Sequence, residues 1–129
     1  MDKLVEKALA FIENADGNVL TVPEVADALK VNRRALERRF KAAECGTLLD
    51  AITEARLRKA ARMLALSDKT IYDIAEECSF STPSYLVSVF RRRFGVTTRE
   101  FRQICRDCGG YDDEEVKRVG LKQWLTSRK

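Results

Sequence analysis

The segment 33–44 places charged side chains at the spacing of one helix face, where they could make directed hydrogen bonds. The charged residues on that face are Arg33, Arg34, Glu37, Arg38 and Lys41. Leu36 and Phe40 fall on the opposite face, which gives the helix an apolar side for packing. An arginine can donate two hydrogen bonds to guanine O6 and N7, and a glutamate can accept one from cytosine N4. The spacing therefore indicates a helix that could read base pairs in a major groove. For Glu37, an ion pair with a neighbouring arginine in solvent is the alternative interpretation.

A second helix of the same kind is predicted over 83–94. Pro83 stands at its first position, where a missing N–H costs nothing, and Gly95 ends it. Leu86 and Phe90 form its apolar side. Its polar candidates for contact with DNA are Ser84, Tyr85, Ser88, Arg91 and Arg92. Serines reach few base edges and arginines at the end of the helix suit phosphates, so this helix should anchor more than it specifies. Tyr85 could equally pack against the preceding turn.

The two segments belong to a repeated pattern. Positions within 21–31 match positions within 70–80 at a constant offset of 49, and positions within 36–41 match positions within 86–91 at an offset of 50. Each copy joins a short helix to a second helix through a tight turn, which is the organisation of a helix-turn-helix. Two copies imply two such units, because a solenoid needs three or more repeats.

The whole chain is predicted to be all-α, with about seven helices. Capping boxes begin four of them, at Thr21, Thr47, Thr70 and Thr97. We divide the chain into a first helix-turn-helix subdomain (1–46), a long bridging helix (47–66), a second helix-turn-helix subdomain (67–108) and a C-terminal extension (109–129). The extension either docks on the body through Trp124 and its apolar neighbours or forms a loose tail.

Charge is unevenly distributed along the 129 residues, whose net charge is +4. Residues 1–29 carry −4, residues 30–106 carry +8, and residues 107–129 are balanced. Positive charge in the repeats is expected of a surface that neutralises phosphates, although a solvated, solubilising surface is the alternative. No apolar run has the length of a membrane span and no signal peptide is visible, so we expect no membrane partner.

The cysteines offer one further possibility for chemistry. Cys105 and Cys108 form a single C-x-x-C pair, which could bind zinc or support redox reactions. Closed zinc sites usually need four ligands, the chain has no histidine, and Cys45 and Cys78 lie in separate repeats. We interpret all four as reduced thiols and expect no metal and no cofactor. Since no nucleotide loop and no nucleophile-and-base spacing is present either, we expect no enzyme and no catalytic residue.

Together these features resemble the DNA-binding domain of the AraC/XylS family of bacterial transcription regulators. The resemblance covers about residues 4–106. It includes the phrases Ser84-Tyr85-Leu86, Phe90-Arg91, Phe94-Gly95-Val96-Thr97 and Phe101-Arg102, and a bridging helix with Arg56-Leu57, Ala60 and Leu64. Three positions depart from the family pattern. Ser79 stands where glycine is usual, Thr98 where proline is usual, and Ser88 where a long polar side chain often reads bases.

Arg34, Glu37 and Arg38 correspond to base-reading positions of the resembling family, and the place of other side chains on the helices predicts their roles. Those expected to read bases are Arg33, Arg34, Glu37, Arg38, Ser84, Tyr85 and Ser88. Those expected to contact phosphates are Arg39, Lys41, Thr82, Arg91, Arg92 and Arg102. We expect the first unit to carry most of the sequence specificity.

The function expected on these grounds is that of a sequence-specific regulator of transcription that binds double-stranded DNA. By resemblance it would be an activator that contacts RNA polymerase, working in the cytoplasm at the nucleoid. The acidic first helix would abut a missing N-terminal effector domain if the chain is an excised part. The alternative is a protein-interaction or adaptor module that uses the basic face and the C-terminal extension, with the Trp124 segment as its anchor.

Overall fold

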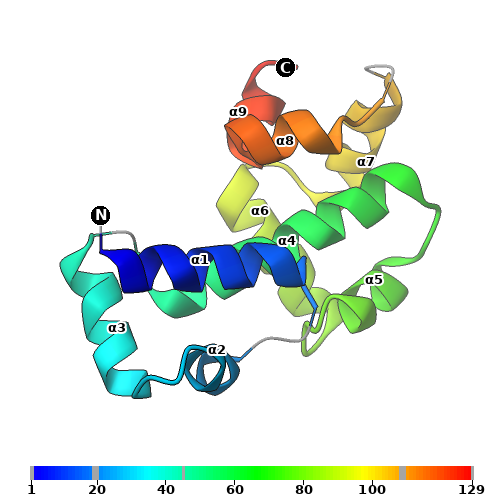
Figure 1. Ribbon diagram of the computed structural model, residues 1–129. Helices are drawn as coiled ribbons and strands as arrows, with labels where there is room; N and C mark the ends of the chain where they lie inside the picture. Colours follow the sequence, from blue (N-terminus) through cyan, green and yellow to red (C-terminus); the bar gives the residue numbers. More distant parts are fainter. Residues whose placement is uncertain (1, 19–20, 45, 108–109, 129) are drawn as a thin grey trace. The chain divides into compact units, whose positions relative to one another are not determined.

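The computed structural model of the chain describes residues 2–18, 21–44, 46–107 and 110–128. Within these ranges every regular element is an α-helix, as the sequence predicts (Figure 1). The chain divides into two compact units, Met1–Arg56 and Leu57–Lys129, called unit 1 and unit 2 below. The boundary falls inside helix α4 (Leu48–Leu66), which therefore supplies side chains to the cores of both units.

Unit 1 combines the first part of α4 with three shorter helices. These are α1 (Lys3–Ala15), α2 (Val22–Ala28) and α3 (Arg33–Ala42). Each begins behind a polar residue whose side chain accepts hydrogen bonds from the first turn, namely Asp2, Thr21 and Asn32. The core is built from Val5, Ala8, Ile12, Val25, Ala26, Leu36, Phe40, Leu48, Ile52 and Ala55. Leu36 and Phe40 are fully buried, so α3 packs through its predicted apolar side.

Unit 2 repeats this arrangement and adds to it. Its helices after α4 are α5 (Ile71–Glu77), α6 (Pro83–Phe94), α7 (Thr98–Asp107), α8 (Asp113–Val119) and α9 (Leu121–Thr126). The predicted apolar side of α6, Leu86 and Phe90, is fully buried, and Val89 is buried with it. The expected seven helices are α1 to α7, and the extension adds α8 and α9 in the part of the chain described.

The bridging helix α4 begins where the sequence predicts. Thr47 and Asp50 form a reciprocal capping box, in which the Asp50 N–H donates to Thr47 Oγ1 (3.0 Å) and the Thr47 N–H to Asp50 Oδ2 (3.1 Å). Its buried residues are Leu48, Ile52, Ala55, Leu57, Ala60, Ala61 and Leu64. Met63, expected to point inward, is only partly buried.

The duplicated turn between the two helices of each motif has the same backbone geometry in both units. Lys30 and Ser79, which are related by the offset of 49, adopt left-handed conformations with φ of 56° and 63°. In unit 1 the Val31 N–H donates to the Ala26 carbonyl. In unit 2 the matching bond joins Phe80 to Ala75 at 2.8 Å. Such a helix end normally uses glycine, because a side chain makes the left-handed conformation costly. Ser79, where the resembling family usually has glycine, therefore stores backbone strain.

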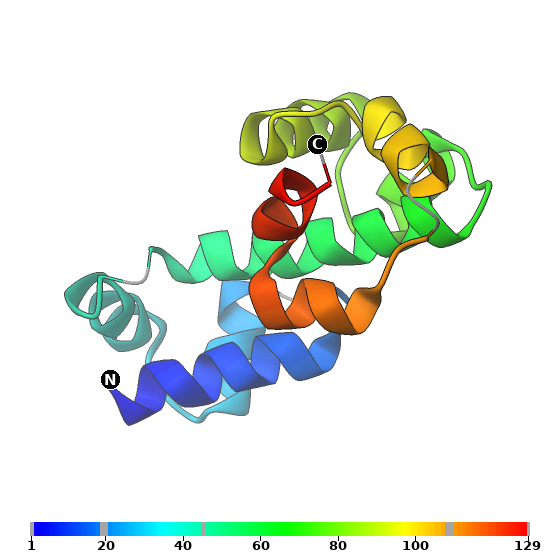
Figure 2. The same ribbon diagram turned by 90° about the horizontal axis from the view of Figure 1, so that it is seen from above.

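The C-terminal extension docks on unit 2. Trp124 is completely buried, and its ring lies 5.4 Å from that of Tyr111 and 6.2 Å from that of Phe101. Figures 1 and 2 both show α9 beside α6, and α8 packs against α9. The buried apolar residues of the extension are Val116, Leu121, Trp124 and Leu125. Of the two predicted states of this segment, the docked one is correct, and a fully buried Trp124 is not exposed to anchor a partner.

Replacing Ser79 with glycine should stabilise the chain by up to about 1 kcal/mol. Glycine removes a left-handed penalty of roughly 1–2 kcal/mol, part of which is offset by its greater freedom in the unfolded chain. Urea unfolding followed by circular dichroism measures the change. The control is Ser81→Gly, at a nearby exposed serine that does not have positive φ, where the same substitution should lower stability slightly. A destabilised Ser79→Gly protein would contradict the strain argument.

Replacing Trp124 with alanine should destabilise unit 2 by about 3–5 kcal/mol, because it empties a fully buried aromatic site. Unfolding followed by circular dichroism is the measurement, since the only tryptophan of the chain is lost. Lys122→Ala, at an exposed position of the same helix, should stay within about 0.5 kcal/mol of the parent. A loss below about 1 kcal/mol for Trp124→Ala would show that α9 adds little packing energy.

Candidate nucleic-acid interface

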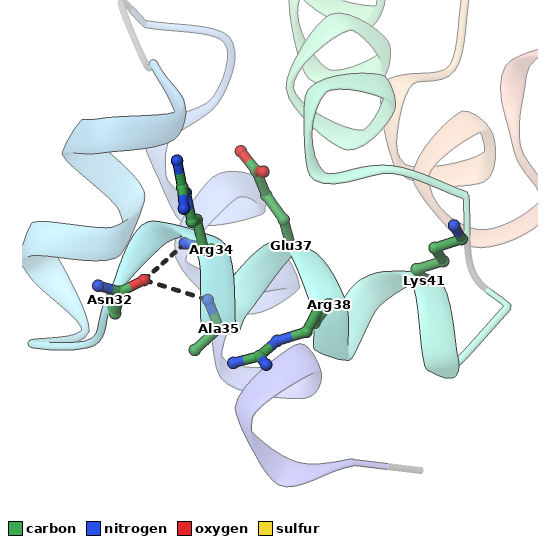
Figure 3. A pocket seen from close by; sticks show the side chains of 6 residues that line it. All are labelled: Asn32, Arg34, Ala35, Glu37, Arg38 and Lys41. Atoms are coloured by element: carbon green, nitrogen blue, oxygen red, sulfur yellow. Dashed lines mark hydrogen bonds between the residues drawn. The ribbon is translucent and has the colours of Figure 1, made fainter.

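The outer face of α3 carries Arg34, Glu37, Arg38 and Lys41, all exposed. Together with Asn32 and Ala35 these residues line an open hollow, and Figure 3 shows them projecting from successive turns of the helix. Asn32 Oδ1 holds the start of α3 by accepting from the N–H groups of Arg34 (2.8 Å) and Ala35 (3.3 Å). The position of these side chains follows from the burial of Leu36 and Phe40, because a helix that packs through one side presents the other.

The outer face of α6 is the equivalent surface in unit 2. Its open hollow is lined by Pro83, Ser84, Val87, Ser88, Arg91 and Arg92. At the offset of 50, the pairs Arg34 and Ser84, Glu37 and Val87, Arg38 and Ser88, and Lys41 and Arg91 occupy matching positions. The predicted residues Ser84, Ser88, Arg91 and Arg92 thus come together on one surface. Sequence reasoning missed Val87, although the offset from Glu37 pointed to it.

Glu37 forms an ion pair with Arg33 in this structure. Glu37 Oε1 lies 3.5 Å from Arg33 Nε, one helical turn away, and both side chains are about half exposed (46% and 58%). An exposed pair of this kind contributes little to stability, so it can open when another partner is offered. The guanidinium groups of Arg34 and Arg38, by contrast, form no ion pair with any residue that the structure describes.

Arg39 lies on the same helix but is bound within unit 1. Its Nη1 donates a 2.7 Å hydrogen bond to Asp2 Oδ2, the carboxylate that caps α1. This contact, together with the bond that Asp2 accepts from the Leu4 N–H, lowers the pKa of the Asp2 carboxyl. In the structure Arg39 therefore ties α3 to the start of α1.

Arg102 is likewise bound within its own unit, unit 2, but to backbone carbonyls. Its Nε donates to the Leu64 carbonyl and its Nη2 to the Lys69 carbonyl, both at 2.8 Å. The side chain thereby joins α7 to the end of α4 and to the connection that precedes α5. Nearby, Lys69 Nζ lies 2.7 Å from Glu77 Oε1, and this bond raises the pKa of the lysine.

Two residues at the start of α6 combine packing with exposure. Thr82 caps the helix by accepting from the Tyr85 N–H (3.0 Å), while remaining exposed itself. The Tyr85 ring lies 6.1 Å from that of Phe80 in the preceding turn, yet half of the residue (50%) is exposed. Tyr85 therefore packs on the turn, which is one of the two predictions for it, and it is also half exposed to solvent.

The cysteines show no arrangement suited to chemistry in the described part of the chain. Cys78 is buried, with its Sγ 3.7 Å from the sulfur of Met63, and burial raises the pKa of its thiol to about 11. Cys105 is also buried. Cys45 and Cys108 lie outside the described residues, so the C-x-x-C pair is seen only in part. No three metal-ligating side chains gather anywhere among residues 2–18, 21–44, 46–107 and 110–128.

None of the described helices has both the length and the apolar character needed to cross a lipid bilayer.

Comparison with known proteins adds an independent observation. The family model of a helix-turn-helix domain matches residues 25–104, a range that contains both outer faces. The xylose operon regulatory protein of Haemophilus influenzae is 34% identical over 104 residues, which are 81% of this chain and 27% of that protein. The chain therefore spans about a quarter of the length of this curated relative.

Two solved structures are similar to the chain. The structure of the xylose-binding transcription activator XylR has a TM-score of 0.68 and 30% identity, over 81% of this chain and 27% of that one. The DNA-binding domain of AdpA, a global transcriptional factor in complex with a target DNA, has a TM-score of 0.68 and 27% identity, over 83% of this chain and 96% of that one. With its two helix-turn-helix motifs and these relatives, the chain belongs to the AraC-type helix-turn-helix family of DNA-binding transcription regulators.

Proposed function

We propose that this chain binds double-stranded DNA at a specific sequence and regulates transcription by inserting α3 and α6 into neighbouring major grooves. The observation that carries the proposal is the pair of outer faces. Each is exposed, and each occupies the matching register of its own helix-turn-helix. The excess of positive charge over residues 30–106 also favours a polyanionic partner.

In this proposal α3 supplies most of the base reading. Arg34 and Arg38 are exposed cations on the N-terminal and central turns, from which an arginine can reach guanine O6 and N7. Glu37 lies between them and can accept from cytosine N4 once its exposed pair with Arg33 opens. Lys41 lies one turn further on and suits a phosphate.

The outer face of α6 anchors more than it specifies. Ser84 and Ser88 have short side chains, so they can form few bonds to base edges, whereas Arg91 and Arg92 suit phosphates at the end of the helix. Thr82 and Tyr85 are exposed beside them and can add contacts to the backbone or to a base.

Arg39 and Arg102 would act indirectly. Both were expected to contact phosphates, but their guanidinium groups are bound to Asp2 and to two backbone carbonyls. We therefore propose that they hold α3 and α7 in place.

Two recognition helices carried by one chain require half-sites about one helical turn apart, roughly 34 Å, and bending of the DNA can help to meet this requirement. A similar solved structure is that of a transcription activator, which supports activation as the outcome of DNA binding. The family resemblance suggests that RNA polymerase is the protein contacted.

Selection from random duplexes should enrich one sequence, and base-by-base substitution of it should reveal an asymmetric site. Replacing base pairs in the half-site of unit 1 should cost about 1–3 kcal/mol each, because bidentate contacts are lost. Replacements in the half-site of unit 2 should cost less. Larger losses in the second half-site would refute the asymmetry, and failure to enrich any sequence would refute specific binding.

Arg38→Ala and Lys41→Ala should weaken binding in different ways. The first should cost about 1–3 kcal/mol and relax the preference at one base pair, as loss of a guanine contact does. The second should weaken binding to all sequences alike and reduce the slope of log K against log salt by about 1. Affinities measured over a salt series on matched and mismatched duplexes separate these behaviours. A uniform loss for Arg38→Ala would make Arg38 a phosphate contact instead.

A further inference from the structure

Val87 lines the hollow on the outer face of α6, and the proposed function gives it no role. It lies between Ser84 and Ser88 in the hollow of this face, where Glu37 lies on α3. Its side chain is only half buried, whereas Leu86, Val89 and Phe90 of the same helix fill the core. Val87 is not among the residues that pack in or against this core, and it lines the hollow instead.

The polar groups around Val87 discriminate weakly between bases. A serine hydroxyl can donate or accept, so it can bond to either kind of base edge. At the expected base-reading positions 84, 85 and 88, this face also lacks the arginine, glutamate, asparagine or glutamine side chains that make bidentate contacts. An apolar contact would therefore add a base preference that these polar groups supply only weakly.

Thymine carries the one apolar group in the major groove, its C5-methyl, which small apolar side chains can contact. Valine suits such a contact because its branched side chain has one strongly preferred rotamer in a helix. Its two methyl groups therefore form a fixed apolar surface, and little rotamer entropy is lost when a ligand covers it.

We infer that Val87 packs against the C5-methyl group of a thymine and makes α6 select an A·T pair in its half-site. The inference rests on the proposed function, since it requires α6 to lie in a major groove. It adds a specificity residue to a face that otherwise anchors through Arg91 and Arg92. At the matching position of α3, Glu37 offers a charged acceptor instead, so the two half-sites should differ in base composition as well as in strength.

The test removes one methyl group from the DNA at a time. In the duplex selected by the 129-residue chain, each thymine of the unit 2 half-site is replaced by deoxyuridine, which keeps the base pair and loses only the C5-methyl. Equilibrium affinities are measured for the parent chain and for Val87→Ala. Circular dichroism checks that the variant is folded, which is expected because alanine favours helix and Val87 does not belong to the buried core.

For the parent chain, one of these replacements should weaken binding about fourfold, the effect of exposing one methyl group. The Val87→Ala chain should show a clearly smaller difference between the two duplexes, because its shorter side chain covers less of the methyl group. As the control, thymines of the unit 1 half-site are replaced in the same way and affinities are measured with the same two proteins. Val87→Ala should not alter the loss of affinity caused by these replacements.

The inference is overturned if the unit 2 half-site contains no preferred A·T pair, or if no single deoxyuridine changes the affinity of the parent chain. It is also overturned if Val87→Ala keeps the full sensitivity. Each of these results leaves specific DNA binding intact. If the proposed function itself is wrong, no duplex is selected, and then both the function and the inference are refuted.

Discussion

Burial of two apolar residues on each recognition helix is the constraint on which the interface depends. Leu36 and Phe40 on α3, and Leu86 and Phe90 on α6, are fully enclosed by the core of their own unit. Turning these side chains to solvent would cost each unit several kcal/mol of folding free energy, so the rotation of each helix about its own axis is fixed. The residues on the opposite side are then presented to solvent regardless of their chemistry. That is why the same surface can carry arginines in one unit and serines in the other.

The helices can hold this orientation because their ends are defined by local hydrogen bonds. Polar caps begin α2, α3, α5 and α6, and left-handed turns at Lys30 and Ser79 end the helix that precedes each recognition helix. Neither turn uses glycine, so the packing of each unit holds a conformation that its residues do not favour. The docked extension adds to this packing in unit 2, where Trp124 lies against Phe101 and Tyr111.

Four of the arginines that the sequence assigns to DNA contact differ in what surrounds them. Arg34 and Arg38 extend from an exposed helix face, whereas Arg39 and Arg102 are bound to a carboxylate and to backbone carbonyls. An arginine that already donates to acceptors of the chain has to exchange those bonds to reach a phosphate. The exchange costs little for the exposed ion pair of Arg39 with Asp2 and more for Arg102, which donates to two backbone carbonyls.

The sequence by itself determined the helices, their caps, the duplication and the buried side of each recognition helix. Helical periodicity and capping are local properties, so they can be read from the spacing of residue types along the chain. Arg34, Glu37, Arg38, Ser84 and Ser88 could be placed on outer faces for the same reason. Only the tertiary structure decided that the extension docks and that Arg39 and Arg102 are bound to partners within their own units. Those outcomes depend on contacts such as Arg102 with Leu64, between residues far apart in the chain, and no local pattern encodes them.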